Sequence, residues 1–321
     1  MYKPINILIT GGCGFIGSNF INQYKNKYPN IKIINFDKLD YCSNSNGIYH
    51  DKLIIGNLND KNYLLKILND YNIDTIIHFA AQTHVDNSFG NSLSFTMDNI
   101  LGTHTLLESC RIYGKINKFI HISTDEVYGE VDINHKGCTE TSLLNPTNPY
   151  AATKTAAEFI VNSYYYSFNL PVIITRSNNV YGERQYYEKL IPKFIFQLLN
   201  NKKCTIHGNG LTRRNFIYIN DLVNAIEIIL HYGEIHNIYN IGTNNEFTVN
   251  EIAEKLIKYL KPNDNINDWI EFVEDRNFND YRYVLNSNIL NKLGWKEETN
   301  FEIGLNKTIE WYKNNKNFFQ I

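Results

Sequence analysis

Short runs of β-branched and apolar residues alternate along the chain with longer stretches in which apolar residues recur every three or four positions. The first half of the chain predicts strands at Ile5–Thr10, Lys32–Asp37, Leu53–Gly56, Thr75–Phe79 and Lys118–Ser123, and helices at Phe15–Lys27, Lys61–Asp70 and Phe95–Tyr113. Strands that alternate with helices form βαβ units. The pattern therefore predicts a parallel sheet that helices cover on both faces.

The alternation continues past the middle of the chain and then loosens. Further elements are predicted at Tyr150–Phe168, Val172–Arg176, Val249–Leu260 and Phe301–Tyr312. We expect an α/β protein of two parts: a doubly wound parallel sheet of the Rossmann type over residues 1–177, and a smaller mixed α/β domain over residues 178–321. At least one segment of the second part is expected to cross back to the sheet.

Composition excludes several classes of protein. Hydrophobic residues make up 43% of the 321 residues and charged residues 20%, which is typical of a globular chain and not of a disordered one. A formal net charge of -2 gives no overall attraction for nucleic acid or an anionic membrane. The sequence contains no apolar stretch of the length that a membrane helix needs, and its first residues do not resemble a signal peptide.

The cysteines and histidines change this picture little. Five scattered cysteines without a CxxC pair favour neither a disulfide framework nor a zinc site, and they fit a reducing compartment. We expect a cytoplasmic protein, in the host cytoplasm if the source is a virus. His121 falls in a β-run and is expected to be a packed strand residue, whereas contact with a ligand is left open for His84. Because a third ligand is missing at suitable spacing, we assign no metal.

A glycine-rich segment between the first strand and the first helix carries the strongest signal for function. In ITGGCGFIGSNF, Gly12, Gly14 and Gly17 satisfy GxGxxG, and Gly11 with the last two gives GxxGxxG. Such glycines allow a tight turn and a close approach of the backbone to a pyrophosphate at the N-terminus of the helix. Asp37 ends the second strand, twenty residues beyond Gly17, where a carboxylate binds an adenosine ribose. An acid there also favours NAD over NADP. The alternative for Asp37 is an ordinary turn residue at a strand end.

Two further segments carry candidate catalytic groups. In YAATK, Tyr150 and Lys154 are four residues apart on a predicted helix, so they share one face, and the ammonium would favour the tyrosinate. The alternative is an ordinary amphipathic helix. In HISTDEVYG, a strand is followed by Thr124, Asp125 and Glu126, at the edge of the sheet where such folds place their chemistry. These residues offer a hydroxyl, a proton donor and a proton acceptor, unless they form only a helix cap or a solvated turn.

With these motifs in place, the chain resembles the extended short-chain dehydrogenase/reductases, and within them the nucleotide-sugar 4,6-dehydratases. The resemblance runs from Ile7 to about Tyr312. It rests on TGGCGFIGSNF, DKLDYCSN, HFAAQTHVDNS, STDEVYG, NPYAATK, NNVYGERQYYEKLIPKF, HGNGLTRRNFIYINDL and YNIGTNNE. The last of these, with FNDYRYVLN and LGWKEETNFEIGLNKTIEWY, is most similar to eukaryotic UDP-glucose 4,6-dehydratases of UDP-rhamnose synthesis.

The resemblance implies NAD-dependent dehydration of UDP-glucose to UDP-4-keto-6-deoxyglucose, the first step of UDP-rhamnose synthesis. Tyr150 takes the proton of the C4 hydroxyl with the help of Lys154, while the C4 hydride passes to NAD. Glu126 then takes the C5 proton and Asp125 protonates the departing C6 hydroxyl. The hydride returns to C6, and Glu126 gives the proton back to C5. Thr124 is expected to bind a sugar oxygen.

The resemblance also implies two sets of binding residues. For the cofactor they are Gly11, Gly14, Phe15, Ile16, Gly17, Asp37, Lys38, Leu39, Asp40, Asn57, Leu58, Ala80, Ala81, Tyr150, Lys154 and Asn179. For the substrate they are Thr83, His84, Thr124, Asn178, Lys189, Leu190, Arg214, Asn240 and Arg276. Surface charge is the alternative for the two arginines.

The chain departs from the family pattern at Asn57, where an aspartate is usual, at Gln82, where a glutamate is usual, and in DRNFND, which lacks a proline and a glycine. This last departure puts the nucleotide in doubt, so dTDP-glucose is the alternative substrate. The motifs also leave open a sugar 4-epimerase or reductase of the same fold, and a non-catalytic NAD-binding scaffold. The resemblance implies a homodimer formed through Phe95–Tyr113 and Tyr150–Phe168, and a downstream epimerase/reductase on a separate chain.

Overall fold

The computed structural model describes residues 1–275 and 278–319, and its largest element is a seven-stranded sheet in which every pair of neighbouring strands is parallel. The strand order is β10-β6-β5-β4-β1-β2-β3. The strands are β1 Asn6–Thr10, β2 Lys32–Asp37, β3 Lys52–Ile55, β4 Thr75–His78, β5 Lys118–Thr124, β6 Val172–Ser177 and β10 Ile238–Ile241. The order reverses direction between β1 and β4, so the sheet is doubly wound as predicted.

Helices cover both faces of this sheet because successive strand residues point to opposite sides. Ile7 and Ile9 pack with α1 and α8, whereas Leu8 packs with α2, α5 and α6. All three of these strand side chains are fully buried. The helices are α1 Phe15–Lys27, α8 Ile219–Tyr232, α2 Lys61–Asp70, α5 Gly102–Tyr113 and α6 Pro149–Phe168.

The predicted helix Phe95–Tyr113 is continuous in the structure but contains a segment of π-helix. Two short helices, α3 Val85–Gly90 and α4 Ser92–Phe95, lead into a π-helical segment, Thr96–Leu101, which continues directly into α5. Apolar periodicity predicted the helix but not this turn of different pitch, because a π-helical turn changes the hydrogen-bond pattern without changing the residue types.

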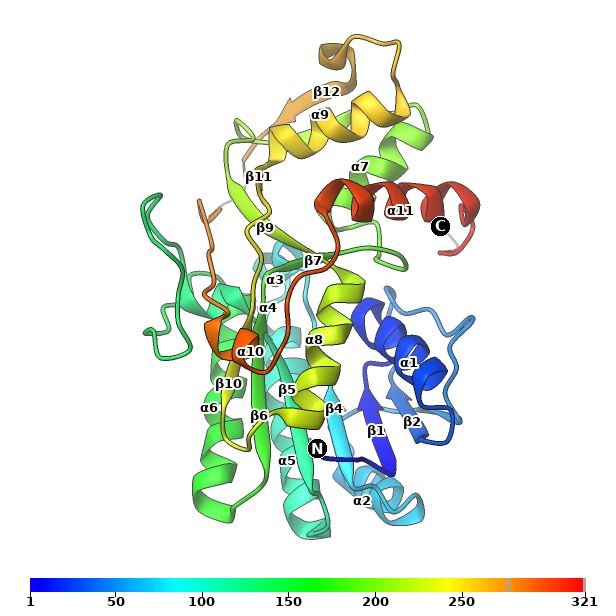
Figure 1. Ribbon diagram of the computed structural model, residues 1–321, viewed down its shortest axis with the longest axis vertical. Coiled ribbons are helices and arrows are strands. Elements are labelled where there is room, and N and C mark those ends of the chain that lie inside the picture. Colours follow the sequence, from blue (N-terminus) through cyan, green and yellow to red (C-terminus); the bar gives the residue numbers. More distant parts are fainter. Residues whose placement is uncertain (276–277, 320–321) are drawn as a thin grey trace.

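Most of the remaining elements form a smaller part, which Figure 1 shows above the sheet. It contains a three-stranded sheet in the order β11-β9-β7 and a two-stranded sheet of β12 and β8. Its strands are β7 Asn179–Tyr181, β8 Cys204–His207, β9 Arg213–Tyr218, β11 Glu246–Thr248 and β12 Ile270–Val273. Its helices are α7 Leu190–Leu199, α9 Val249–Leu260 and α11 Phe301–Asn314, with a 3₁₀ turn at Ile266–Trp269. The short helix α10 Asn288–Lys292 packs against β10 of the large sheet, and a second 3₁₀ turn, Asp125–Tyr128, follows β5.

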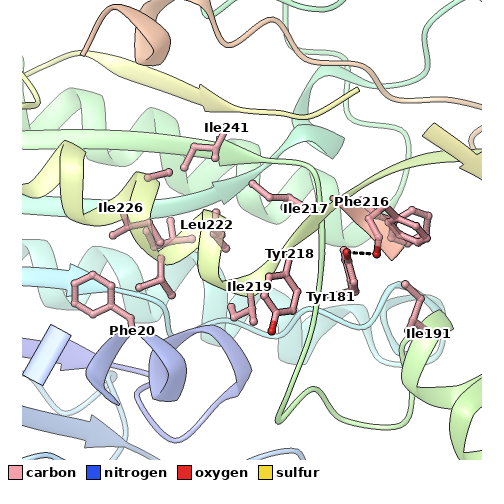
Figure 2. Close-up of a cluster of buried hydrophobic side chains, with 14 of the residues drawn as sticks. Phe20, Tyr181, Ile191, Phe216, Ile217, Tyr218, Ile219, Leu222, Ile226 and Ile241 are labelled. Carbon is pink, nitrogen blue, oxygen red and sulfur yellow. Dashed lines mark hydrogen bonds between the residues drawn. The ribbon is translucent and has the colours of Figure 1, made fainter. Parts of the chain in front are cut away.

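Two late elements lie with the large sheet although they follow β9 in sequence: β10 is one of its strands, and α8 packs on one of its faces. β10 pairs with β6, and α8 packs on α1. One hydrophobic cluster therefore runs from the sheet into the smaller part, and Figure 2 shows Phe20 and Leu222 at one side of it and Tyr181 and Phe216 at the other. The two parts share a core, and the domain boundary at residue 178 stays a prediction.

Within the described residues, no helix combines the length and the apolar character that crossing a membrane requires.

Candidate active site

A cavity of about 620 Å³ lies where the carboxyl ends of the parallel strands meet the smaller part of the chain. Cavities of this size commonly hold small-molecule ligands, and this edge of a doubly wound sheet is where such ligands bind. Its wall includes most of the predicted binding residues, namely Gly11, Gly14, Phe15, Ile16, Gly17, Asp37, Lys38, Asp40, Asn57, Leu58, Ala80, Ala81, Thr83, His84, Thr124, Glu126, Tyr150, Lys154, Asn178, Asn179, Lys189, Leu190 and Arg214.

The glycine-rich turn forms one end of the cavity, and its shape depends on missing side chains. Gly11 has a φ of +72°, and a Cβ atom there would lie 2.6 Å from the Cα atom of Ala80. A Cβ atom at Gly17 would lie 2.5 Å from the carbonyl oxygen of Gly11. Gly14 is the N-cap of α1 and offers no side-chain cap, so the first N–H groups of the helix are left for an anion in the cavity.

Asp37 both lines the cavity and holds the glycine-rich turn. Its Oδ2 accepts a hydrogen bond from the Cys13 N–H at 2.9 Å, and its Oδ1 accepts one from the Leu39 N–H at 2.8 Å. Asp37 can therefore be both a turn residue and a ligand-binding residue, because its carboxylate bonds to the turn and still lines the cavity.

A polar cluster beside Asp37 contains one cation and two carboxylates. The Lys38 Nζ lies 2.9 Å from the Asp40 carboxylate and 2.6 Å from that of Asp98. The Gln82 side-chain amide donates to both acids, at 2.7 and 2.9 Å. A glutamate at position 82 would instead place a third carboxylate beside these two. The departure at Gln82 thus has a local electrostatic explanation.

Tyr150 and Lys154 both reach the cavity from the first turns of α6, as their spacing predicts. The Lys154 Nζ donates to the carbonyl oxygen of Ile122 at 2.7 Å. Burial lowers the pKa of Lys154 to about 8. Burial and the nearby Glu126 raise the pKa of Tyr150, and a hydrogen bond with Thr124 opposes this shift. Proton removal from Tyr150 therefore requires positive charge close to the ring.

Asp125 and Glu126 begin the 3₁₀ turn that follows β5. The Thr124 Oγ1 caps this turn by accepting from the Glu126 N–H at 3.3 Å. The Asp125 Oδ2 accepts from the Asn178 side-chain amide at 2.8 Å, and the Glu126 Oε2 accepts from the Asn148 amide at 3.0 Å. The sequence offered a helix cap and an acid pair as alternatives. The structure contains both, because Thr124 caps the turn that carries Asp125 and Glu126.

Burial is the main cause of the pKa shifts of both acids. It raises the pKa of Asp125 to about 7, with a smaller contribution from Glu126, and the amide of Asn178 opposes the shift. It also raises the pKa of Glu126, against the Asn148 hydrogen bond. Only Glu126 lines the cavity wall, whereas Asp125 lies behind it with 2% of its surface exposed.

The far end of the cavity is formed by the smaller part of the chain. The Lys189 Nζ donates to the carbonyl oxygen of Thr83 at 2.7 Å. The Arg214 guanidinium lies 4.8 Å from the centre of the Tyr283 ring and donates to the Asn279 Oδ1 at 3.4 Å. Arg276, the other arginine expected here, lies outside the described residues.

The structure places two of the predicted binding residues away from the cavity wall. Asn240 is fully buried and absent from the cavity wall, because its Oδ1 accepts from the Tyr128 hydroxyl at 2.8 Å and its Nδ2 donates to the Cys138 carbonyl at 2.9 Å. Leu39 also lies outside the wall and is 38% exposed, and it contributes the backbone N–H that holds Asp37.

The two histidines differ in environment. His84 lines the cavity, with its Nε2 3.8 Å from Asp86 and its Nδ1 3.9 Å from Glu188. His121 is fully buried in β5, as expected of a packed strand residue, and its ring centroid lies 5.3 Å from that of His78. Across residues 1–275 and 278–319, three or more His, Cys, Asp or Glu side chains do not gather in a way that could hold a metal ion.

Sequence reasoning missed several residues of the site. Asn148 caps α6 by accepting from the Ala151 N–H and also donates to Glu126. The Asn-Pro pair before Tyr150 was a visible signal for this cap. Asp280 and Tyr283 line the cavity near Glu126. Only the pairing of distant segments brings them there, so local patterns could not predict them.

Comparison with known proteins gives a consistent result. The family model described as GDP-mannose 4,6 dehydratase matches residues 8–308. A trifunctional UDP-glucose 4,6-dehydratase/UDP-4-keto-6-deoxy-D-glucose 3,5-epimerase/UDP-4-keto-L-rhamnose-reductase of Arabidopsis thaliana is 50% identical over 323 residues, which cover 98% of this chain and 48% of that protein. The chain thus spans about half the length of this plant relative.

A dTDP-D-glucose 4,6-dehydratase of Dictyostelium discoideum is 48% identical over 359 residues, covering 98% of this chain and 82% of that protein. Among solved structures, the dTDP-glucose 4,6-dehydratase of Streptomyces venezuelae, which contains NAD, superposes with a TM-score of 0.92 at 34% identity. The match covers 98% of this chain and 99% of that one. These findings confirm the predicted fold class and the predicted family resemblance.

Proposed function

The chain belongs to the family described as GDP-mannose 4,6-dehydratase, and from this membership we propose that it is an NAD-dependent nucleotide-sugar 4,6-dehydratase. One observation carries the proposal: Tyr150, Lys154 and Glu126 line a single cavity, and Asp125 lies directly before Glu126 on the same turn, behind the cavity wall. A simple reductase or 4-epimerase needs the first pair alone. A scaffold needs neither pair.

The glycine-rich end of the cavity fits NAD. A Cβ atom at Gly11 or Gly17 would clash with backbone atoms of the tight turn and its neighbours. The N-terminus of α1, which has no side-chain cap, suits a pyrophosphate. Asp37 suits the adenosine ribose and disfavours a 2′-phosphate. NAD held there would supply the hydride chemistry, as acceptor of the C4 hydride and donor of a hydride to C6.

The protein's part in the oxidation is to remove the proton of the C4 hydroxyl. Tyr150 is the proposed base, and its raised pKa means that burial alone opposes this role. The Lys154 ammonium, with a pKa of about 8, supplies positive charge from the same helix face, and the Thr124 hydroxyl also favours the tyrosinate. Removing either the charge or the phenol therefore stops the first step.

The elimination needs a base at C5 and an acid at C6. Glu126 faces the cavity and is the proposed base. Asp125, whose pKa of about 7 keeps much of it protonated near neutral pH, is the proposed acid. The C4 ketone acidifies the C5 hydrogen, Glu126 removes it, and water leaves from C6 with the proton of Asp125. When the hydride is added at C6, Glu126 returns its proton to C5. Two neighbouring acids with different partners thus divide the two proton transfers.

UDP-glucose is the proposed substrate, with dTDP-glucose as the alternative. The plant and Dictyostelium relatives are 50% and 48% identical, so overall identity does not decide the nucleotide. The choice of UDP rests on YNIGTNNE, FNDYRYVLN and the segment from Leu293, which are most similar to the UDP-glucose enzymes. A separate epimerase/reductase would then complete UDP-rhamnose.

The test is to incubate the purified protein with UDP-glucose and dTDP-glucose in separate samples and to follow each by proton NMR. A new C6 methyl doublet together with a 4-keto sugar is expected, and the faster donor identifies the nucleotide. If both donors stay unchanged with NAD supplied, the dehydratase assignment for these two sugars fails. Inversion of the configuration at C4, without formation of a methyl group, would instead identify an epimerase.

We also propose a homodimer formed through Phe95–Tyr113, which includes the π-helical segment and α5, and through Tyr150–Phe168 of α6. Apolar side chains remain exposed on this surface, and they are Met97, Leu101, Ile112, Phe159 and Phe168. A second copy of the chain is the proposed occupant, because such a patch is suited to a symmetric helical interface.

A further inference from the structure

The proposed catalytic groups lie on two separate segments of the chain. Tyr150 and Lys154 are on α6, whereas Asp125 and Glu126 are on the 3₁₀ turn after β5. The oxidation and the elimination must act on the same bound sugar, at neighbouring carbons. The relative placement of the helix and the turn therefore matters as much as either segment alone.

A buried ion pair lies on the helix side of this junction. Glu158 follows Lys154 by one turn of α6, and its carboxylate accepts from the Arg176 Nε at 3.1 Å and from the Nη2 at 2.5 Å. The two side chains are only 1% and 3% exposed. Arg176 comes from β6, so the bidentate pair attaches the catalytic helix to the sheet.

The other side of the same arginine reaches the turn. The Arg176 Nη1 donates to the Tyr128 hydroxyl at 2.7 Å, and its guanidinium lies 4.7 Å from the centre of the Tyr128 ring. The Tyr128 hydroxyl in turn donates to the Asn240 Oδ1 at 2.8 Å. Tyr128 is the last residue of the turn that begins with Asp125, two residues after Glu126. One guanidinium thus bonds to both segments.

Stability alone does not explain this network. Burying two charges costs desolvation, and a well-packed apolar pair of similar volume is often at least as stable. What an apolar pair lacks is direction, because bidentate and hydroxyl hydrogen bonds fix distances and angles. The network runs from α6 through β6 and the turn to β10, immediately behind the residues that face the cavity.

We propose that Arg176 and Tyr128 are positioning residues that hold the turn carrying Asp125 and Glu126 in register with the helix carrying Tyr150 and Lys154. Loss of the link should let the turn shift while the helix, still fixed by the Glu158 pair, keeps its place. Elimination should then suffer more than oxidation. The inference rests on the proposed dehydratase function.

The test is Tyr128→Phe, which keeps the ring under the guanidinium and removes only the hydroxyl that links Arg176 to Asn240. The matched control is Tyr239→Phe. Tyr239 is next to Asn240 in β10, but the hydroxyl of this buried tyrosine accepts from the Glu234 N–H and not from a member of the network. Two partial reactions are compared: formation of reduced nicotinamide by its absorbance, and exchange of the C5 hydrogen with deuterated solvent.

In Tyr128→Phe we expect C5 exchange and 6-deoxy product to fall about tenfold, the effect of one lost hydrogen bond, while reduced nicotinamide forms at nearly the normal rate and accumulates. Tyr239→Phe should leave the ratio of the two rates unchanged. Equal losses in both partial reactions, or a Tyr128→Phe protein that behaves like its control, would overturn the proposal.

A second measurement works without substrate. Hydrogen–deuterium exchange of the peptide covering residues 124–130 should be faster in Tyr128→Phe than in Tyr239→Phe, with the α6 peptide unchanged. Unchanged exchange at 124–130 overturns the positioning role. If the unmodified protein dehydrates neither sugar, the proposed function fails, while this exchange experiment still decides whether the link holds the turn.

Discussion

Asp125 and Glu126 are neighbours in the chain, but their carboxyl groups have different surroundings. Asn178 donates to Asp125, and Asn148 donates to Glu126. Burial raises the pKa of both, to about 7 for Asp125. The sequence could predict the acid pair from its place after a strand. It could not predict this division, because both amides come from segments distant in the sequence.

The first prediction concerns pH. The raised pKa of Asp125 means that the acid is protonated below about pH 7 and loses its proton above it, so elimination should slow as the pH rises through about 7. Asp125→Asn should lower the elimination rate by 10²–10⁴-fold, roughly the contribution of a general acid, and remove this alkaline limb. The measurement is the pH profile of methyl formation by NMR.

The pKa of Asp125, and with it this pH profile, also depends on the groups around its carboxyl group. They are Thr124, Glu126, Asn178 and Arg214. Lys154, with a pKa of about 8, loses its charge at higher pH and would slow oxidation instead. In the Asp125→Asn protein, the oxidation step should therefore keep its normal pH dependence. An alkaline limb that persists unchanged in methyl formation by Asp125→Asn would assign that limb to another group.

At the scale of elements, local rules predicted the regular parts of the chain. α1, α2 and α9 have the predicted bounds, because glycine, an aspartate cap and a capping box mark where they begin. The smaller part was predicted only loosely. β7, β9 and β11 are short strands whose pairing joins segments far apart in sequence, so periodicity within a window could not specify them.

The second prediction separates the two roles of Asn148. Its Oδ1 caps α6, and its Nδ2 donates to Glu126. Asn148→Ala loses both interactions and should cost about 1 kcal/mol of unfolding free energy. Asn148→Asp keeps a capping oxygen but places a carboxylate beside Glu126, so the folded protein should be more stable than Asn148→Ala and yet show a further raised pKa of the base.

Thermal unfolding measures the change in stability. The acid limb of the pH profile of C5 exchange measures the change in the pKa of Glu126. In Asn148→Asp, the acid limb should move to higher pH than in the unmodified protein. Equal acid limbs in the two proteins would show that the Asn148 side chain does not act on Glu126.

The third prediction concerns the glycine-rich turn. In Gly17→Ala, the added Cβ would lie 2.5 Å from the Gly11 carbonyl oxygen and 2.8 Å from the Gly12 Cα, both backbone atoms that cannot rotate away. We expect a loss of about 1–3 kcal/mol of stability and weaker retention of NAD. Thermal unfolding with and without added NAD measures both. The control is Gly90→Ala, because a Cβ atom at Gly90 would meet open space and the φ of Gly90 is ordinary. Gly114 has a φ of +70°, so Gly114→Ala is unsuitable as a control.

At the scale of the whole molecule, α8 and β10 decide how the two parts are joined. The loosened pattern after residue 178 predicted a segment that returns to the sheet, but not which one. α8 is a buried helix with apolar residues on most sides, and such a helix fits equally well in either part. Its place is fixed by contacts with α1 and by the pairing of β10 with β6, which join segments far apart in the sequence.

The last prediction tests the proposed dimer through its surface. Phe159 lies on the outer face of α6 and is 63% exposed. A lysine there places a charge in the proposed helical interface, where desolvation is costly, so Phe159→Lys should convert the dimer to a monomer. Leu143→Lys is the control, because Leu143 is 91% exposed on a loop before α6. Size-exclusion chromatography with light scattering should give a dimer for the unmodified protein and for the control. A monomeric unmodified protein, or a Phe159→Lys protein that stays dimeric, would exclude this surface as the interface.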